Sequence, residues 1–164
     1  MSTFQNEIIK LLTENARYTN AQMAKILGVT EKEIEDNVLE LENKGIIVKY
    51  SAIINSEAID GEKVVEALIE VKVAPQKLKG FDSYAEEIYS FKEVKSLYLM
   101  SGGFDLAVFV EGKNLGDVAK FVSEKLSIID GITSVQTHFI LKKYKVEGQI
   151  TSISEESQRQ IIGA

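Results

Sequence analysis

The chain contains no cysteine and only one histidine, and these two shortages exclude several kinds of chemistry. Among its 164 residues, disulfides, thiol catalysis and thiolate metal sites have no residue to form them. The single histidine, His138, has no Cys or His partner for a metal site, so we expect it to be structural. The sequence also lacks a nucleophile–base signature, a catalytic carboxylate pair and a phosphate-binding glycine loop. We therefore expect no enzyme, no bound metal and no cofactor.

Long apolar runs are also missing, although 45% of the residues are hydrophobic. No run approaches the roughly 20 residues that a membrane-spanning helix requires. The first ten residues, MSTFQNEIIK, lack the basic and then apolar order of a secretory signal. With 27% charged residues, the composition is that of a folded protein with a core, not of a disordered chain. We therefore expect a folded cytoplasmic protein with no membrane partner.

Basic residues are too few for a strong surface that binds polyanions. The chain has 19 Lys and Arg residues against 25 Asp and Glu residues, a net charge of −6. Residues 1–55 carry six basic and eight acidic residues, and residues 56–164 carry the remaining net charge of −4. Sequence-independent DNA affinity comes from Lys and Arg side chains that neutralise phosphates. Any DNA binding by a single copy is therefore expected to be weak.

Three short helices are predicted in residues 1–55. The first covers residues 4–14, whose apolar side chains recur at helical spacing. Each of the next two begins with a capping-box pattern and ends at a glycine. These positions are Thr19 and Gln22 with Gly28, and then Thr30 and Glu33 with Gly45. The break between the two helices predicts a helix-turn-helix, and GIIVKYSAIIN is expected to follow it as a short strand pair or an extended exit.

A different pattern begins after a predicted linker at residues 56–62. Residues 63–145 alternate strand-like and helix-like segments in the order β-α-β-β-α-β, which is the ferredoxin-like arrangement. The strands are predicted at 63–73, 93–100, 105–112 and 131–145, and the helices at 80–91 and 114–126. The polar residues 146–164 are expected to form a loose tail or a docking arm. The fold class is therefore α+β.

Four stretches carry a resemblance to a known family through their order and spacing. They are NARYTNAQMAKILGVTEKEI, LELENKGIIVKYSAIIN, MSGGFDL and GITSVQTHFILKKYK. Over about residues 4–145 the chain resembles the Lrp/AsnC family of leucine-responsive, or feast/famine, transcription regulators. Gly102 and Asp105 fit the family's Gly-x-x-Asp turn, and Thr137 stands at its threonine. The resemblance implies a winged helix-turn-helix joined to a ferredoxin-like effector domain. It also implies dimers that pair through their sheets, tetramers or octamers, and amino-acid effectors bound between subunits.

The third predicted helix is acidic, with six acids against two lysines in residues 30–45. Asn37 stands where family members usually carry an arginine. A charge run on a helix is most often a solvated face. However, only a few residues of a recognition helix contact bases, where Glu can accept from cytosine and Asn can pair with adenine. The candidate DNA-contacting residues are Arg17, Lys25, Thr30, Lys32, Glu33, Asn37, Lys44 and Lys49.

The stretch SGGFD has two interpretations. From the residues alone it is most simply a β-hairpin turn, because glycine supplies positive φ and Asp tolerates turns. The family resemblance favours an effector site, in which open backbone N–H groups suit a carboxylate and the acid suits an ammonium group. The candidate effector-binding residues are Met100, Ser101, Gly102, Gly103, Phe104, Asp105, Thr133, Gln136 and Thr137. The register of the last strand decides which of its residues face the site.

The sequence thus predicts a DNA-binding transcriptional regulator that senses a small metabolite, most simply an amino acid. Its expected partners are double-stranded DNA, the effector and further copies of the same chain. The alternative is a metabolite-sensing interaction protein with weak or lost DNA binding, which the acidic helix and Asn37 favour. An enzyme on a ferredoxin-like scaffold is disfavoured because the catalytic groups are missing, and fold alone does not assign function.

Overall fold

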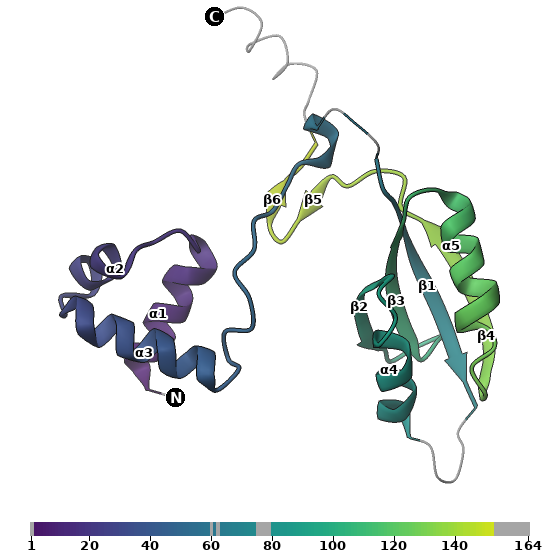
Figure 1. Ribbon diagram of the computed structural model, residues 1–164, viewed down its shortest axis with the longest axis horizontal. Coiled ribbons are helices and arrows are strands. Elements are labelled where there is room, and N and C mark those ends of the chain that lie inside the picture. Colours follow the sequence, from purple (N-terminus) through teal and green to yellow (C-terminus); the bar gives the residue numbers. More distant parts are fainter. Residues whose placement is uncertain (1, 60, 62, 75–79, 153–164) are drawn as a thin grey trace, which may run out of the picture. The chain divides into compact units, whose positions relative to one another are not determined.

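The chain divides into two compact units in a computed structural model that describes residues 2–59, 61, 63–74 and 80–152. Unit 1 extends to Ile54 and unit 2 begins at Asn55. Figure 1 shows helices in unit 1, and a sheet with covering helices in unit 2. The two units correspond to the two sequence patterns, one with helical and one with mixed periodicity.

Unit 1 consists of three short helices, α1 (Thr3–Glu14), α2 (Asn20–Leu27) and α3 (Glu31–Asn43). Each helix begins with a capping box, at Ser2, Thr19 and Thr30 respectively. In each box a side-chain hydroxyl accepts a hydrogen bond from the amide three residues later, and the side chain there accepts one from the cap amide. The structure confirms the two boxes predicted from the sequence and adds the one at Ser2.

The core of unit 1 lies where the apolar faces of the three helices meet. Its buried residues are Ile8, Met23, Ala24, Ile34 and Leu41. At the joint between α2 and α3, Gly28 has a φ of 69°, a left-handed conformation that other residues rarely adopt. The predicted helix-turn-helix joint is therefore present, and its turn depends on this glycine.

Residues 46–55 leave α3 as an extended exit with no strand partner, and this is one of the two forms predicted for the segment (Figure 1). Tyr50 fastens the exit to α3, because its hydroxyl donates a hydrogen bond to the Glu42 carboxylate at 2.9 Å. Burial and the neighbouring Glu42 charge together raise the pKa of Tyr50 to about 12. A short 3₁₀ turn, η1 (Ser56–Ala58), follows in unit 2.

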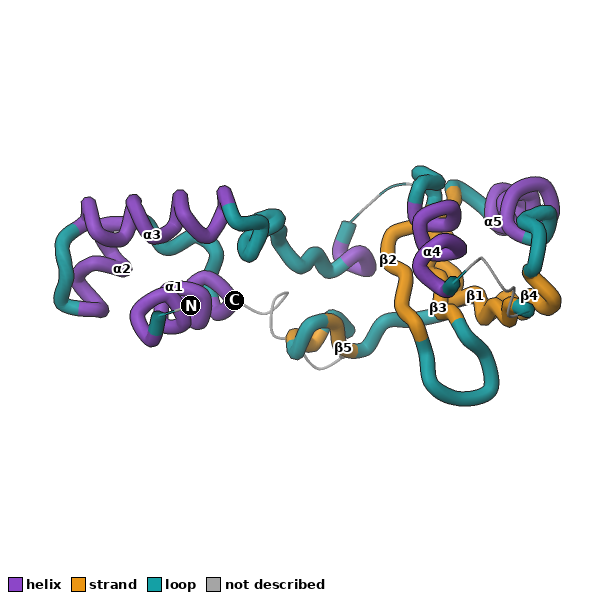
Figure 2. Tube along the Cα trace, turned by 90° about the horizontal axis from the view of Figure 1, so that it is seen from below, coloured by secondary structure: helices purple, strands orange, loops and turns teal. Residues whose placement is uncertain are grey.

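Unit 2 is built on a four-stranded antiparallel sheet with the order β2-β3-β1-β4. The strands are β1 (Val65–Val73), β2 (Val94–Leu99), β3 (Leu106–Gly112) and β4 (Ile132–Phe139). The connecting helices are α4 (Phe81–Tyr89) and α5 (Leu115–Phe121), and α5 continues into a π-helical turn, η2 (Val122–Leu126). This order confirms the predicted βαββαβ arrangement, and both helices lie on the same side of the strands (Figure 2).

Strand β1 shows how the two faces of the sheet differ. Alternate residues from Ala67 to Val73 are buried in the core that α4 and α5 cover. The residues between them point to the opposite face, which we call the open face. There Leu68 lies opposite Phe109 of β3, whose ring contacts Tyr98 of β2 edge to face at 5.9 Å. The open face is therefore apolar at its centre.

The end of the chain differs from the sequence prediction. Strand β4 ends at Phe139 and not at residue 145, because its pairing with β1 ends at Ala67, near the start of β1 at Val65. The segment predicted as a polar tail begins instead with a hairpin of β5 (Lys145–Val146) and β6 (Gln149–Ile150). Buried Thr151 anchors this hairpin through hydrogen bonds to two backbone carbonyls. Residues 153–164 of the predicted tail lie outside the described residues.

Candidate DNA-binding and effector-binding sites

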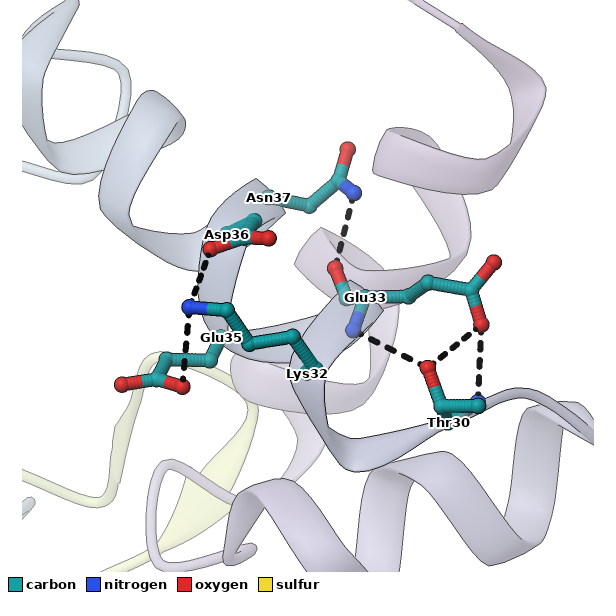
Figure 3. Close-up of polar contacts among 6 residues, drawn as sticks. All are labelled: Thr30, Lys32, Glu33, Glu35, Asp36 and Asn37. Carbon is teal, nitrogen blue, oxygen red and sulfur yellow. Dashed lines mark hydrogen bonds and ion pairs between the residues drawn. The ribbon is translucent and has the colours of Figure 1, made fainter.

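Thr30 and Glu33, two of the candidate DNA contacts, form the capping box at the N-terminus of α3. The Glu33 carboxylate accepts hydrogen bonds from the Thr30 amide at 2.9 Å and from the Thr30 hydroxyl at 2.7 Å (Figure 3). The Glu33 amide in turn donates to the Thr30 hydroxyl at 3.3 Å. The bonds from Thr30 lower the pKa of the Glu33 carboxyl group. Both side chains are therefore engaged in capping their own helix.

The candidate lysines on α3 and at its end pair with acids of the same helix. Lys32 Nζ lies 2.8 Å from Asp36 and 3.5 Å from Glu35 (Figure 3), and the hydrogen bond to Asp36 and the charge of Asp36 raise the pKa of Lys32. Lys44 pairs with Glu40. Such exposed ion pairs are weak, so each lysine can leave its acidic partner and bind another anion instead. While both lysines stay paired with acids of α3, the surface of the helix is mainly negative.

Asn37, the candidate adenine reader, lies at the edge of the buried face of α3. Its side chain is half-buried, and its Nδ2 donates a hydrogen bond to the Glu33 carbonyl oxygen at 2.8 Å (Figure 3). The amide group has a second hydrogen and an acceptor oxygen, which are the groups that a contact with adenine requires. The bond to the Glu33 carbonyl oxygen uses one amide hydrogen and leaves these two groups for another partner.

Three candidate phosphate contacts remain available in unit 1. Arg17 lies in the loop before α2, Lys25 lies in the last turn of α2, and Lys49 lies in the exit segment. All three side chains are exposed, and none forms an ion pair within the part of the chain that the structure describes. Phosphate neutralisation by unit 1 therefore depends on residues outside α3 more than on α3 itself.

The loop between β2 and β3 contains the candidate effector site and is anchored by Asp105. The Asp105 amide donates to the Val71 carbonyl oxygen at 3.0 Å, and the Met100 amide donates to the Asp105 carbonyl oxygen at 2.8 Å. The carboxylate oxygen Oδ2 accepts from the Val73 amide at 2.9 Å. Val73 follows a bulge in the ladder between β1 and β4, so this carboxylate satisfies an amide at an irregular point. Asp105 thus has a structural role whether or not it binds a ligand.

The tip of this loop is open. Ser101, Gly102 and Gly103 are exposed, whereas Phe104 and Asp105 are half-buried and Met100 is 43% exposed. Gly102 has a φ of 148°, while Gly103 has an ordinary backbone conformation. A methyl group placed on either glycine would meet no atom within 4 Å. Gly102 is therefore required for its backbone conformation, and the space beside both glycines is free.

The register of β4 separates the three candidate effector residues on that strand. Gln136 lies opposite Glu70 and points to the open face, whereas Thr137 lies opposite Ile69 and points to the helix-covered face. The Thr133 hydroxyl donates to the Lys72 carbonyl oxygen at 3.2 Å, at the end of β1 that Asp105 contacts. Among these three residues, the structure thus places Thr133 at the end of β1 that Asp105 also contacts, and it sends Gln136 and Thr137 to opposite faces.

Sequence reasoning did not single out Leu39, which lies on α3 with 53% of its surface exposed. The signal was present in the sequence, because Leu39 is out of phase with the buried residues Ile34 and Leu41. An exposed apolar residue on the outward side of the second helix of a helix-turn-helix is a candidate contact residue.

His138 lies on the open face, where its Nε2 is 3.2 Å from a Glu70 carboxylate oxygen. Among the described residues, no three acidic or histidine side chains are grouped so that they could hold a metal ion. Within the same part of the chain, every helix is too short or too polar to cross a membrane.

Both units match models of protein families. Residues 1–48 match a model described as winged helix-turn-helix DNA-binding, and residues 66–150 match the Lrp/AsnC ligand binding domain. The chain is 43% identical over 158 residues to YugG of Bacillus subtilis (strain 168), described as an HTH-type transcriptional regulator. That alignment covers 96% of this chain and 95% of YugG. This chain is also 35% identical over 138 residues to the HTH-type transcriptional regulator LrpA of Pyrococcus abyssi. That alignment covers 84% of this chain and 94% of LrpA.

Two solved structures show the same fold. E. coli AsnC has a TM-score of 0.67 and 22% identity, with 93% of this chain and 99% of AsnC covered. The transcriptional regulator NMB0573 of Neisseria meningitidis, solved as a complex with L-Met, has a TM-score of 0.68 and 23% identity. That comparison covers 94% of this chain and 96% of NMB0573.

Proposed function

Because the chain belongs to the Lrp/AsnC family of DNA-binding transcriptional regulators, we propose that unit 2 binds an amino acid and thereby changes how unit 1 binds double-stranded DNA. The family gives the chain a DNA-binding unit and a ligand-binding unit. The observation in this chain that supports an amino acid is the loop at residues 100–105, which combines two exposed glycines with an anchored carboxylate. The regulator acts in the cytoplasm.

The chemistry of this loop suits the two ends of an amino acid. Gly102 and Gly103 are exposed residues with free space beside them, so their backbone N–H groups can donate to a carboxylate. The second carboxylate oxygen of Asp105, Oδ1, receives no hydrogen bond from the described residues and can accept from an ammonium group. Met100 and Phe104 supply apolar surface, and Thr133 supplies a hydroxyl at the same end of the sheet. The L-Met complex of NMB0573 supports the same ligand class.

Self-association is part of this function. The open face has an apolar centre of Leu68, Tyr98 and Phe109, and α4 and α5 cover the other face. A second copy of the sheet is the occupant that the family resemblance implies, with dimers joining into a tetramer or octamer. Linking two or more DNA-binding units raises their effective concentration at a site, which compensates for weak binding by each one.

The alternative function, a metabolite-sensing interaction protein with weak or lost DNA binding, is favoured by one observation. The two lysines in residues 30–45 are paired with acids of α3, so that the helix presents mainly negative charge. In this alternative the acidic helix contacts a partner protein. The two functions differ in whether the full chain binds DNA at all.

A titration of DNA binding in the presence and absence of each amino acid tests the proposal. We expect one amino acid, or a small chemical group of them, to change the DNA affinity by a factor between about 5 and 150, the usual range of coupling between two sites. Calorimetry of the same panel without DNA measures effector binding directly. DNA binding that no amino acid changes, together with no heat of binding, would reject the effector. Effector binding without DNA binding would favour the alternative.

A further inference from the structure

The outward side of α3 carries one apolar residue among polar ones. The residues opposite the buried face recur at helical spacing and are Lys32, Asp36, Leu39 and Asn43. Leu39 stands in the middle of this outward stripe with 53% of its surface exposed. It is not a member of the unit 1 core, and it is not among the half-buried residues that pack against that core. The fold of unit 1 therefore does not account for Leu39.

Many of the polar side chains of α3 are already engaged by their own helix. Glu33 caps the helix with Thr30, and Lys32 pairs with Asp36. Asn37 donates to a backbone carbonyl and is half-buried at the edge of the buried face. Leu39 has no such engagement, so it can contact a partner without breaking a hydrogen bond or an ion pair.

We propose that Leu39 is a specificity-determining residue that contacts the C5 methyl group of a thymine in the major groove. This inference rests on the proposed function, because α3 is the second helix of a helix-turn-helix, the element that enters the major groove. Thymine is the one base that presents a methyl group there, and proteins read that group by apolar contact. An apolar contact requires no positive charge, which makes it compatible with a helix that carries mainly acids.

The surrounding charges are consistent with contacts to bases and not to phosphates. Asp36 lies three residues before Leu39 on the outward stripe, and an acid repels phosphates but can accept a hydrogen bond from the cytosine amino group. Phosphate contacts fall to the exposed Arg17, Lys25 and Lys49, which form no ion pair with the described residues. On this assignment α3 supplies sequence preference, and the three flanking cations supply most of the electrostatic affinity.

A uracil scan of a bound DNA site tests this contact. The full chain first selects its preferred duplex from a random library, and each thymine of that duplex is then replaced in turn by deoxyuridine, which lacks only the methyl group. We expect the wild-type chain to lose about fourfold in affinity at one thymine of each half-site, the effect of one buried methyl group. Leu39→Ala should bind the thymine and uracil duplexes equally. Leu39→Met should keep the discrimination.

Ile26→Ala is the matched control, because Ile26 lies on α2 with the same 53% exposure. It should retain the preference for thymine, and thermal melts should show all three variants folded. The inference is overturned if no thymine is sensitive to loss of its methyl group, or if Leu39→Ala still discriminates. It is equally overturned if Leu39→Ala changes the particle mass in light scattering but not the discrimination, since Leu39 then packs against another copy. Failure of the wild-type chain to bind any duplex would overturn the proposed function as well.

Discussion

Several candidate contact residues of this protein also stabilise its own helices and loops through hydrogen bonds. Glu33 is one example. Its carboxylate accepts two hydrogen bonds from Thr30, and these lower the pKa of Glu33 below its ordinary value of 4.5. A carboxyl group with a lowered pKa in the folded state stabilises the fold above its ordinary pKa. That contribution is lost as the pH falls through the lowered pKa.

We predict that Glu33→Gln makes the loss of stability of unit 1 in acid shallower than in the wild type. Gln at this position still completes a capping box, so stability near neutral pH should change little. The effect should be partial, because Lys44 also lowers the pKa of Glu40 in unit 1. Urea-unfolding midpoints measured from neutral pH to below pH 4.5 provide the test. Identical acid dependence in the two proteins would show that the Thr30–Glu33 contact does not operate in solution.

Asp105 has two roles that different substitutions separate. Asp105→Ala leaves the Val73 amide without an acceptor and should lower the free energy of unfolding by about 1–3 kcal/mol. Asp105→Asn retains a carbonyl oxygen for that amide but removes the negative charge. We predict that Asp105→Asn folds like the wild type and loses most of its affinity for the amino acid in calorimetry. An Asn variant that binds the effector as tightly as the wild type would leave Asp105 with its structural role alone.

At the scale of elements, the loop between β2 and β3 offers a matched pair of glycines. Gly102→Ala forces an alanine into a backbone conformation with a φ of 148° and should lower the free energy of unfolding by about 1 kcal/mol or more. Gly103→Ala meets no such strain and no neighbouring atom within 4 Å, so unit 2 should keep its stability. Thermal melts compare the two variants. Equal stability would mean that Gly102 does not hold this conformation in solution.

Capping and turn residues allowed most helix boundaries to be predicted from the sequence. The register between strands that lie far apart in the chain could not be predicted. The capping residues Thr19 and Thr30 and the turn at Gly28 act within a few residues, so their signals lie together in the chain. The register that sends Gln136 and Thr137 to opposite faces depends on β1, more than 60 residues earlier. One residue of register decides the face of every side chain, and nothing local fixes it.

The hairpin at residues 145–150 was missed for a different reason. Its turn places Glu147 at a φ of 46°, a conformation usually taken by Gly, Asn or Asp. The Glu-Gly pair therefore lacks the Asn-Gly or Asp-Gly signal on which a hairpin prediction depends. The structural role of Asp105 could not be predicted from the sequence either, because its bond to Val73 joins residues that lie 32 positions apart in the chain.

At the scale of the whole molecule, the apolar centre of the open face predicts self-association. We expect light scattering to give a mass at least twice that of the 18.2 kDa chain at micromolar concentrations. Phe109→Asp places a charge at the centre of the open face and should reduce the mass to that of the monomer. Ile128→Asp is the control, because Ile128 is 71% exposed and lies outside the sheet, so that variant should keep the wild-type mass. A monomeric wild-type chain would contradict this prediction.

The sign and distribution of charge decide how this protein can bind DNA. Six acids on α3 weaken attraction to phosphates, and Arg17, Lys25 and Lys49 are left to supply it. Specific binding should therefore depend strongly on base contacts and on assembly. Lys25→Ala should weaken binding to all sequences alike and reduce the slope of log affinity against log salt by about 1 for each subunit engaged.

The most direct test of DNA-binding regulation is one measurement of affinity. The full-length protein is titrated against duplex DNA from beside its own gene and against a shuffled duplex of the same composition, at low and at physiological salt. We predict specific binding to the first duplex that persists at physiological salt, and binding to the shuffled duplex that is lost as salt is raised. Equal binding to both duplexes, or no binding to either at low salt, would contradict the account.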